Sequence, residues 1–339
     1  KVFGIFCLYV PEEIIRAAGG WCVGLCAGAE FAYDQVEQIM PRNSSPVIKS
    51  FMGFKLAKVC PYIESADLVI GETTCDGKKK AYELLGDIHN VYVMELPQMK
   101  RAKDLAMWRS EIVELIARAE EVTGKQITVE SLRAAIKEVN DKRRALQRIA
   151  VTRAADPVPI SGKDALLATQ VAFYDDVPRF TQAMNGLADE LEARVAAGEG
   201  AAPRGAKRVL ITGTPMALPN WKLHDIVEKA GGVVVGEEMC TGSRYYQDLV
   251  SEEADTLDEI IDDIAAKYLD INCACFTPNQ GRRDDVVRMA KELGADGVID
   301  YSLQFCGLYE MESNGVENAV RDAGLPVLGS VADTVEVIE

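Results

Sequence analysis

Histidine is almost absent from this chain of 339 residues, which contains only His89 and His224. Zinc hydrolases and haem proteins depend on imidazole ligands, so this scarcity argues against both kinds of site. His89 precedes an apolar strand and is interpreted as a surface or capping residue. His224 falls on a predicted helix and is interpreted as a histidine whose hydrogen bonds are satisfied by the fold.

Long apolar runs and a basic excess are also missing. No run approaches the roughly 20 apolar residues that a membrane helix needs, and no secretory signal pattern occurs. The net charge is −16, whereas binding to a nucleic-acid backbone requires clustered lysine and arginine. No Walker sequence occurs, so we do not expect the chain to hydrolyse ATP itself. These absences predict a cytoplasmic protein that binds neither membrane nor nucleic acid.

Cysteine, by contrast, occurs nine times, an odd number spread over a long chain. Disulfide frameworks belong to short secreted chains, and zinc ribbons take their ligands from close CxxC pairs, which this sequence lacks. The pattern therefore favours metal binding or redox chemistry by thiolates that come from distant parts of the chain.

Six of the nine cysteines form two matched sets, one in each half of the sequence. The first member of each set follows a strand, a short helix, a Gly-Gly pair and a second strand, and it begins a Cys-X-Gly motif. The last member of each set follows the motif Ala-Asp-X-Val-Ile. Such self-similarity indicates a duplicated unit, and the repeated cysteines suggest a shared ligand role. The two sets are Cys26, Cys60 and Cys75, and Cys240, Cys275 and Cys306.

The strand and helix signals predict an α/β protein with two Rossmann-like lobes. Each lobe is built on a parallel sheet, the lobes are related by internal duplication, and a helical segment joins them. The expected boundaries are 1–103 for the N-terminal lobe, 104–204 for the helical segment and linker, and 205–339 for the C-terminal lobe. In the helical segment, Ser161 to Asp164 forms a capping box. The expected strands are Val2–Leu8, Trp21–Leu25, Leu68–Gly71, Val91–Glu95, Val209–Thr212, Val233–Val235, Ile271–Phe276, Gly297–Tyr301 and Pro326–Leu328.

Most of the paired cysteines follow predicted strands, and open parallel sheets bind ligands beyond the carboxyl ends of their strands. Soft thiolates that converge from separate loops suit an iron–sulfur cluster. A cubane held by three cysteines leaves one iron for substrate, solvent or a bridging atom, which favours catalysis over simple electron transfer. If the lobes face each other, two such cubanes can share a bridge. We therefore predict that all six paired cysteines bind iron.

The other three cysteines, Cys7, Cys22 and Cys273, have no counterpart in the opposite half and are interpreted as small buried hydrophobic residues. Near the predicted ligands, Glu72 and Gln304 are candidates for hydrogen bonds that support a cluster. Asp76 to Lys80 begins a helix next to Cys75, where free backbone N–H groups favour an anion. The alternative for these lysines is a solvated face. Gly281-Arg-Arg is open to the same two interpretations.

The residues around the cysteines resemble those of the 2-hydroxyacyl-CoA dehydratase and benzoyl-CoA reductase family. This resemblance spans nearly the whole chain, and it implies two Rossmann-like lobes, iron–sulfur cofactors and a separate ATP-hydrolysing iron–sulfur activator that delivers a low-potential electron. The motifs that carry it are Val23-Gly-Leu-Cys26-Ala-Gly, Ala66-Asp-Leu-Val-Ile-Gly-Glu-Thr-Thr-Cys75-Asp-Gly-Lys-Lys-Lys, Asn220-Trp-Lys-Leu, Gly236-Glu-Glu-Met-Cys240-Thr-Gly-Ser-Arg and Asp296-Gly-Val-Ile-Asp-Tyr-Ser-Leu-Gln-Phe-Cys306.

Ordinary dehydratase subunits of that family hold one 4Fe–4S cluster through three cysteines, whereas six matched cysteines are more similar to its double-cubane cluster proteins. The resemblance then implies a double-cubane 8Fe–9S cluster, two 4Fe–4S units bridged by sulfide, and the reduction of small molecules. Two alternatives stay open: a dehydratase-like subunit with a single 4Fe–4S cluster that acts on an acyl-CoA, and a non-enzymatic electron carrier. A homodimer is expected from the frequency of such assemblies, and anaerobic life from the oxygen sensitivity of an open-iron cluster.

Overall fold

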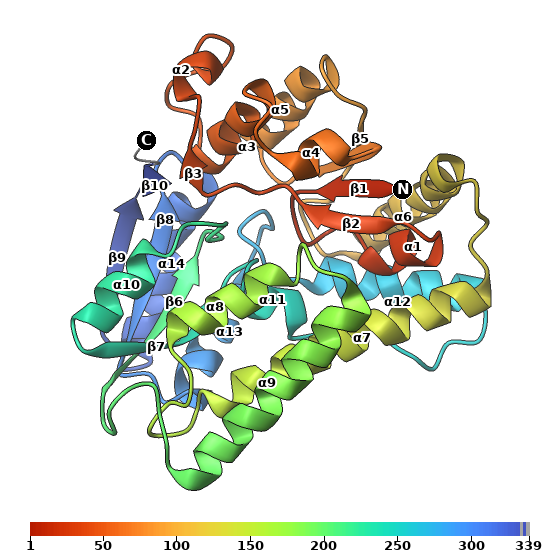
Figure 1. Ribbon diagram of the computed structural model, residues 1–339. Helices are drawn as coiled ribbons and strands as arrows, with labels where there is room; N and C mark the ends of the chain where they lie inside the picture. Colours follow the sequence, from red (N-terminus) through yellow and green to blue (C-terminus); the bar gives the residue numbers. More distant parts are fainter. Residues whose placement is uncertain (333–334, 337–339) are drawn as a thin grey trace.

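Two four-stranded parallel sheets form the framework of the molecule (Figure 1). The computed structural model describes residues 1–332 and 335–336. The strand order is β2-β1-β4-β5 in the first sheet and β7-β6-β8-β9 in the second. In both sheets the first strand along the chain lies between the second and the third, as an internal duplication predicts. The strands are β1 (Val2–Ile5), β2 (Trp21–Gly24), β4 (Leu68–Glu72), β5 (Val91–Met94), β6 (Lys207–Gly213), β7 (Gly232–Glu238), β8 (Gly297–Leu303) and β9 (Val327–Ala332).

Helices cover both sheets, and four further helices join the lobes, so the α/β prediction with two Rossmann-like lobes is confirmed. The N-terminal lobe carries α1 (Glu12–Ala17), α2 (Tyr33–Val36), α3 (Pro46–Leu56), α4 (Pro61–Ser65) and α5 (Asp76–Gly86). The joining helices are α6 (Ala102–Thr123), α7 (Val129–Thr152), α8 (Gly162–Val171) and α9 (Val177–Ala197). The C-terminal lobe carries α10 (Lys222–Lys229), α11 (Ser243–Tyr246), α12 (Leu257–Asp270), α13 (Gln280–Glu292) and α14 (Gly307–Asp322).

Local sequence signals fix the ends of the joining helices. The Ser161 hydroxyl accepts a hydrogen bond from the Asp164 amide at 3.0 Å, which confirms the expected capping box of α8. Gly198 ends α9 with a φ of 70°, a left-handed conformation that glycine adopts without steric cost. Helices α7 and α9 run side by side as the long pair in Figure 1. In the described part of the chain, no helix combines the length and hydrophobicity needed to cross a bilayer.

One strand prediction was wrong. Residues 271–276 form a buried, irregular segment in which the Cys273 amide donates to the Ile271 carbonyl and the Phe276 amide to the Cys273 carbonyl. These short-range bonds turn the chain back on itself, so Cys273 and Cys275 do not share the face of a strand. The apolar run predicted a strand because burial alone produces the same composition in a buried loop.

The lobes and the helical segment share one main hydrophobic core. It contains Phe3 of β1, Trp108 of α6, Leu132 of α7 and Ile264 of α12, all fully buried. Helix α12 belongs to the C-terminal half of the chain but packs against α6 and α7. A short parallel pair, β3 (Ala29–Glu30) with β10 (Val335–Glu336), also connects the two ends of the chain. The relative placement of the lobes is therefore set by packing.

A buried ion pair ties α7 to the second sheet. The Arg153 guanidinium donates to both carboxylate oxygens of Glu237, at 2.7 and 2.8 Å, and to the Val234 carbonyl at 2.9 Å. His224 Nε2 lies 3.0 Å from the same carboxylate, as expected for a histidine held by the fold. Although burial opposes it, the Arg153 cation lowers the pKa of Glu237 to about 2.

Replacing Arg153 with Met leaves the Glu237 carboxylate buried without its cation, and we expect a loss of about 3 to 5 kcal/mol in the free energy of unfolding. Arg109→Met is the matched control, because its pairs with Asp258 and Asp262 are largely exposed and contribute below about 1 kcal/mol. Urea denaturation near neutral pH measures both losses. Equal losses for the two variants would contradict the role of the buried pair.

Candidate functional site

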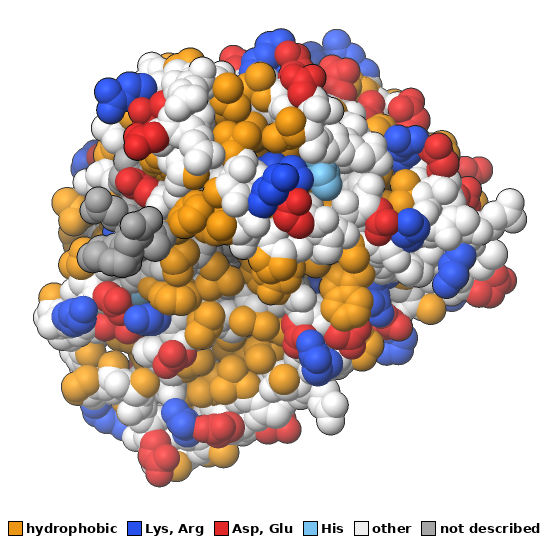
Figure 2. All heavy atoms as spheres, turned by 45° about the horizontal axis from the view of Figure 1, so that its top comes forward, with side chains coloured by type: hydrophobic (Ala, Val, Ile, Leu, Met, Phe, Trp, Pro, Cys, Tyr) orange, Lys and Arg blue, Asp and Glu red, His pale blue; other side chains and the backbone are white. Residues whose placement is uncertain are grey.

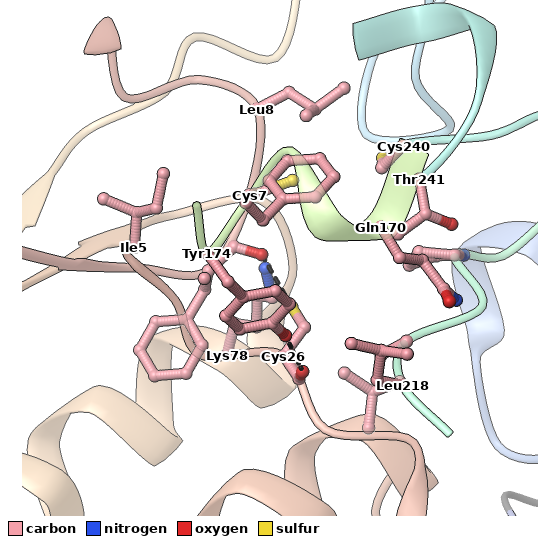
Figure 3. Close-up of a pocket in the computed structure, with 16 residues that line it drawn as sticks. Ile5, Cys7, Leu8, Cys26, Lys78, Gln170, Tyr174, Leu218, Cys240 and Thr241 are labelled. Carbon is pink, nitrogen blue, oxygen red and sulfur yellow. Dashed lines mark hydrogen bonds between the residues drawn. The ribbon is translucent and has the colours of Figure 1, made fainter. Parts of the chain in front are cut away.

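A cavity of about 70 Å³ lies where the two lobes and the helical segment meet (Figure 3). The N-terminal lobe contributes Cys7, which follows β1, and Cys26, which follows β2. The C-terminal lobe contributes Cys240, which follows β7. Gln170 of α8 and Tyr174, just after that helix, line another side. The cavity therefore lies beyond the carboxyl ends of both sheets, the position at which parallel sheets bind ligands.

The glycine of each Cys-X-Gly motif is required by close backbone approaches. The Gly28 amide donates to the Leu218 carbonyl of the other lobe at 2.8 Å, and a Cβ at Gly28 would lie 2.1 Å from the Ala217 oxygen. A Cβ at Gly242 would lie 2.2 Å from the Glu237 oxygen. The motif thus allows the segment after Cys26 to contact the second lobe directly, which closes the cavity on that side.

Four thiols form a continuous series on the C-terminal side of the cavity. Cys240 lies between Cys7 and Cys273, and Cys273 lies next to Cys275; interaction between neighbouring thiols changes the pKa of each. Interaction with Cys240 lowers the pKa of Cys273, and the Arg244 cation acts in the same direction. Neither Cys7 nor Cys273 was expected at this place, because neither has a counterpart in the other half of the sequence.

Polar groups of both lobes approach these sulfur atoms. The Tyr9 hydroxyl lies 3.6 Å from Cys275 Sγ, and the Tyr309 hydroxyl lies 3.5 Å from Cys273 Sγ. The Arg244 guanidinium lies 3.9 Å from Cys240 Sγ. Hydrogen bonds to sulfur stabilise the thiolate form, so this side of the cavity is suited to electron-rich sulfur.

Two buried arginines build the wall behind Cys240. Arg244 donates to both carboxylate oxygens of Glu238 and, at 2.5 Å, to the Tyr309 hydroxyl. Arg282 donates to Glu238 at 3.2 Å and to Glu312 at 2.5 Å. Of the alternatives for Gly281-Arg-Arg, this places Arg282 in the interior, where it supports Glu238. No local pattern predicted the contact, because it joins residues from α11, α13, α14 and the end of β7.

On the N-terminal side, Cys75 is the N-cap of α5, and its Sγ accepts a hydrogen bond from the Lys78 amide at 3.4 Å. The Lys78 side chain reaches the cavity, whereas Lys79 pairs with Asp76 near the surface. Although burial opposes it, nearby Tyr82, Cys7, Glu72 and Cys26 raise the pKa of Lys78. One lysine of the run is therefore a cationic part of the site, and the others belong to a solvated face.

Cys306 occupies the position in the second lobe that Cys75 occupies in the first. Each is the N-cap of the helix after the third strand of its sheet, where the helix dipole favours a thiolate. Burial raises the pKa of Cys306 to about 12, and the nearby Cys75 acts in the same direction, so the two thiols interact across the lobes. Gln304 is exposed, and its amide donates to the Ala332 carbonyl at 2.7 Å.

Cys26 and Cys60 share a neighbour in Tyr174. The Tyr174 hydroxyl donates to the Cys26 carbonyl at 3.5 Å, and burial together with the Cys26 and Cys60 thiols raises the pKa of this tyrosine. Cys60 is the N-cap of α4. The Cys26 thiol donates to the Phe6 carbonyl at 2.7 Å, and burial raises the pKa of Cys26 to about 12. Hydrophobic side chains gather across the middle of the face shown in Figure 2.

Glu72, at the end of β4, supports the cavity from below. Its side chain is fully buried and accepts hydrogen bonds from the Cys7 amide at 3.2 Å and from the Tyr82 hydroxyl at 3.4 Å. Burial raises the pKa of Glu72, and the Lys78 cation opposes this shift. Glu72 thus fixes the backbone that presents Cys7 to the cavity.

Comparison with known proteins decides the family. Residues 7–337 match the model of the 2-hydroxyglutaryl-CoA dehydratase D-component family. The chain belongs to this family. The resemblance seen in the sequence motifs is thereby confirmed, and the chain is a member of a family of dehydratase and reductase components.

Three relatives show the range of the D-component family. The chain is 38% identical over 326 residues to "Putative dehydratase subunit YjiM" of Escherichia coli (strain K12), which covers 94% of the chain and 82% of the relative. It is 24% identical over 333 residues to the (R)-phenyllactyl-CoA dehydratase beta subunit of Clostridium sporogenes, covering 96% and 84%. It is 23% identical over 316 residues to one of the benzoyl-CoA reductase subunits of Thauera aromatica, covering 90% and 78%.

No three histidine, cysteine or acidic side chains among the residues described for this D-component homologue surround a single point closely enough to hold one metal ion. The thiols are instead spread along the cavity from both lobes. Such an arrangement suits a cluster, whose thiolates bind different iron atoms, because the ligands need not meet at one point.

Replacing Glu72 with Gln tests its burial in the metal-free protein. A carboxyl group whose pKa is raised by folding contributes stability below its unfolded pKa and loses it as pH rises through the folded pKa. Glutamine does not ionise, so the free energy of unfolding of the variant should rise relative to that of the wild type between about pH 4 and about pH 7. Urea denaturation at several pH values measures this difference, with Glu83→Gln on the exposed face of α5 as a control. A constant or falling difference would refute it.

Proposed function

We propose that this chain is an iron–sulfur reductase component. It accepts low-potential electrons from an ATP-hydrolysing iron–sulfur activator and reduces small molecules at a double-cubane 8Fe–9S cluster. The observation that carries the proposal is the approach of thiols from two equivalent lobes to one interlobe cavity. The proposed ligands are Cys26, Cys60 and Cys75 from one lobe and Cys240, Cys275 and Cys306 from the other.

The donor set of the chain supports this cofactor. Thiolates are the soft ligands that iron–sulfur clusters take, and donors to sulfur tune the reduction potential of a cluster. When bound, the cluster would supply stored electrons at the cavity. Arg244 and Tyr9 would hold donors near the sulfur of Cys240 and Cys275, and Lys78 would place a positive charge beside Cys26. Glu72 and Gln304 remain proposed supporting residues.

The partner follows from the energetics of such a site. A cluster of very negative potential needs more driving force than common donors supply, and this sequence has no Walker motif with which to obtain it from ATP. A separate activator that couples ATP hydrolysis to electron transfer would supply it. A homodimer, a cytoplasmic location and an anaerobic setting complete the proposal. The carboxylates that give the chain its charge of −16 offer an activator a surface for electrostatic docking.

A second candidate is favoured by the names of two relatives, an acyl-CoA dehydratase beta subunit and a benzoyl-CoA reductase subunit. In that case the chain holds one 4Fe–4S cluster and acts on a CoA thioester beside another protein component. A non-enzymatic electron carrier is the third possibility. Cluster content separates the first candidate from the second, and turnover separates an enzyme from a carrier.

Metal analysis of anaerobically purified protein tests the cluster. We expect about eight iron atoms and about nine sulfides per chain, whereas a single cubane gives about four of each. Cys240→Ala should lose about half of the iron, because one cubane loses a ligand. Cys22→Ala is the matched control and should keep all of it, since Cys22 lies within β2 and away from the interlobe cavity.

The same analysis on Cys7→Ala and Cys273→Ala decides whether these two thiols are ligands, because both lie next to Cys240. Full iron content in both variants is expected. About four irons in the wild type, or unchanged iron in Cys240→Ala, would contradict the double-cubane proposal.

Turnover is tested with an ATP-hydrolysing iron–sulfur activator, MgATP, a chemical reductant and a set of small oxidised acceptors. We expect acceptor reduction that requires all the components and that is lost in Cys240→Ala. Reduction of the cluster without any product would support the electron carrier instead, and dehydration of a 2-hydroxyacyl-CoA would support the second candidate.

A further inference from the structure

A second, smaller cavity of about 20 Å³ lies beside the interlobe cavity. Ile5, Cys7, Leu8 and Phe173 line both, so these four side chains form the partition between them. The far side of the small cavity is polar although it lies in the interior. Its polar lining consists of Glu12, Arg143, Tyr245, Lys267 and Tyr268.

Lys267 is the one of these polar residues that also lines an open surface groove of about 580 Å³. The groove lies between the start of α6 and the residues of α12, and Arg101, Asp248 and Asp263 are among its walls. The Lys267 side chain is 9% exposed. This lysine therefore stands at the boundary between solvent and the small cavity.

The carboxylates near Lys267 are already matched by other cations. Glu12 accepts two hydrogen bonds of 2.7 Å from Lys142, and Glu13 accepts one of 2.7 Å from Arg143. Within the described residues, Lys267 has no carboxylate at ion-pair distance, and its ammonium lies 4.1 Å from the ring centre of Tyr268. Two acids thus face three buried cations, and Lys267 is the cation without a carboxylate partner.

This surplus sets the protonation of Lys267. Burial and the neighbouring Arg143 cation lower the pKa of Lys267 to about 7, whereas Glu13, Asp248 and Glu12 oppose the shift. An amine with such a pKa both releases and takes up a proton near neutral pH. The titratable and charged groups that surround it are Glu12 and Glu13 of α1, Lys142 and Arg143 of α7, Tyr245 and Asp248 near α11, Asp263, Tyr268 and Asp270 of α12, Lys100 and Arg101 before α6, and Cys7 and Cys22 across the cavity.

The small cavity also has the polarity to hold water. Arg143 lines it, and the Nε of this buried arginine has no hydrogen-bond partner in the described structure. A volume of about 20 Å³ accepts roughly one water molecule, which needs several polar neighbours. Such a water would connect Lys267 with the partition that contains Cys7.

We propose that Lys267 is a proton-relay residue, which takes protons from the surface groove and passes them through the small cavity to the interlobe cavity. The inference rests on the proposed function, because reduction of a small molecule consumes protons there. In each two-electron reduction the activator supplies two electrons and the relay supplies two protons. For each proton, an N–H bond of the Lys267 ammonium breaks toward the cavity, and the resulting amine regains a proton from water in the groove.

Three variants of the loaded protein test the relay with the activator, MgATP and a reducible acceptor. Lys267→Met cannot carry a proton, and Lys267→Arg keeps the charge but does not release its proton, so both should lower the reduction rate about 100-fold. Lys103→Met on the exposed side of α6 should match the wild type. The wild-type rate should fall above about pH 7, where the amine form of Lys267 predominates, and Lys267→Met should lose this dependence.

Readouts other than turnover separate a relay from a structural role. Iron content and electron uptake without acceptor should be unchanged in Lys267→Met. Its unfolding midpoint near pH 7 should be higher than that of the wild type, because folding no longer buries an unpaired ammonium. A lower midpoint, or a reduction rate within about twofold of the wild type, would overturn the relay.

Failure of the proposed function gives a different result. If the wild type holds iron but reduces no acceptor, the reductase assignment fails, and the lysine is then examined by NMR of ε-¹³C-labelled lysine. A resonance that titrates near pH 7 and is missing in Lys267→Arg supports proton exchange at this site. A Lys267 resonance that titrates near about pH 10 would overturn it.

Discussion

The interlobe cavity depends on the facing carboxyl ends of two equivalent sheets. Because both lobes have the same strand order, the segments after corresponding strands come to corresponding places, and Cys75 and Cys306 begin equivalent helices. The shared core that includes Trp108 and Ile264 holds the lobes in this relation. Without that packing, cysteines separated by more than two hundred residues would not interact.

Buried charge is the second constraint on the structure. Arg153 with Glu237, Arg244 and Arg282 with Glu238, and the groups around Lys267 all lie in the interior. Burial of a charge is costly unless a partner and hydrogen bonds offset it. The pairs at Glu237 and Glu238 meet this condition and brace the second lobe. Lys267 does not, which is why it is the group among them with a function to explain.

Sequence reasoning predicted the fold well, because the duplicated units carry strong local signals. The Gly-Gly pairs, the Ala-Asp-X-Val-Ile motifs and the capping box at Ser161 depend on nearby residues, and the corresponding elements were confirmed. The lobe boundaries and the identity of the six ligands remain predictions. The expected strand at 271–276 was wrong, because a buried loop and a buried strand have the same composition.

The parts of the site that sequence did not predict come from long-range packing. Cys7 lines the cavity through the turn after β1, and Cys273 reaches Cys240 because the irregular segment folds toward α11. Arg244 and Lys267 acquire their surroundings from elements far away in the chain. A pattern search compares the two halves, so it finds residues that are duplicated and misses those that occur once.

The central claim is that thiolates from both lobes hold iron in the cavity between them. The most direct test is an anomalous-scattering map at the iron edge from crystals grown without oxygen. The account predicts two adjacent iron groups in the interlobe cavity, one beside Cys26, Cys60 and Cys75 and the other beside Cys240, Cys275 and Cys306. A map with no iron there, or with iron beside one lobe alone, would contradict it.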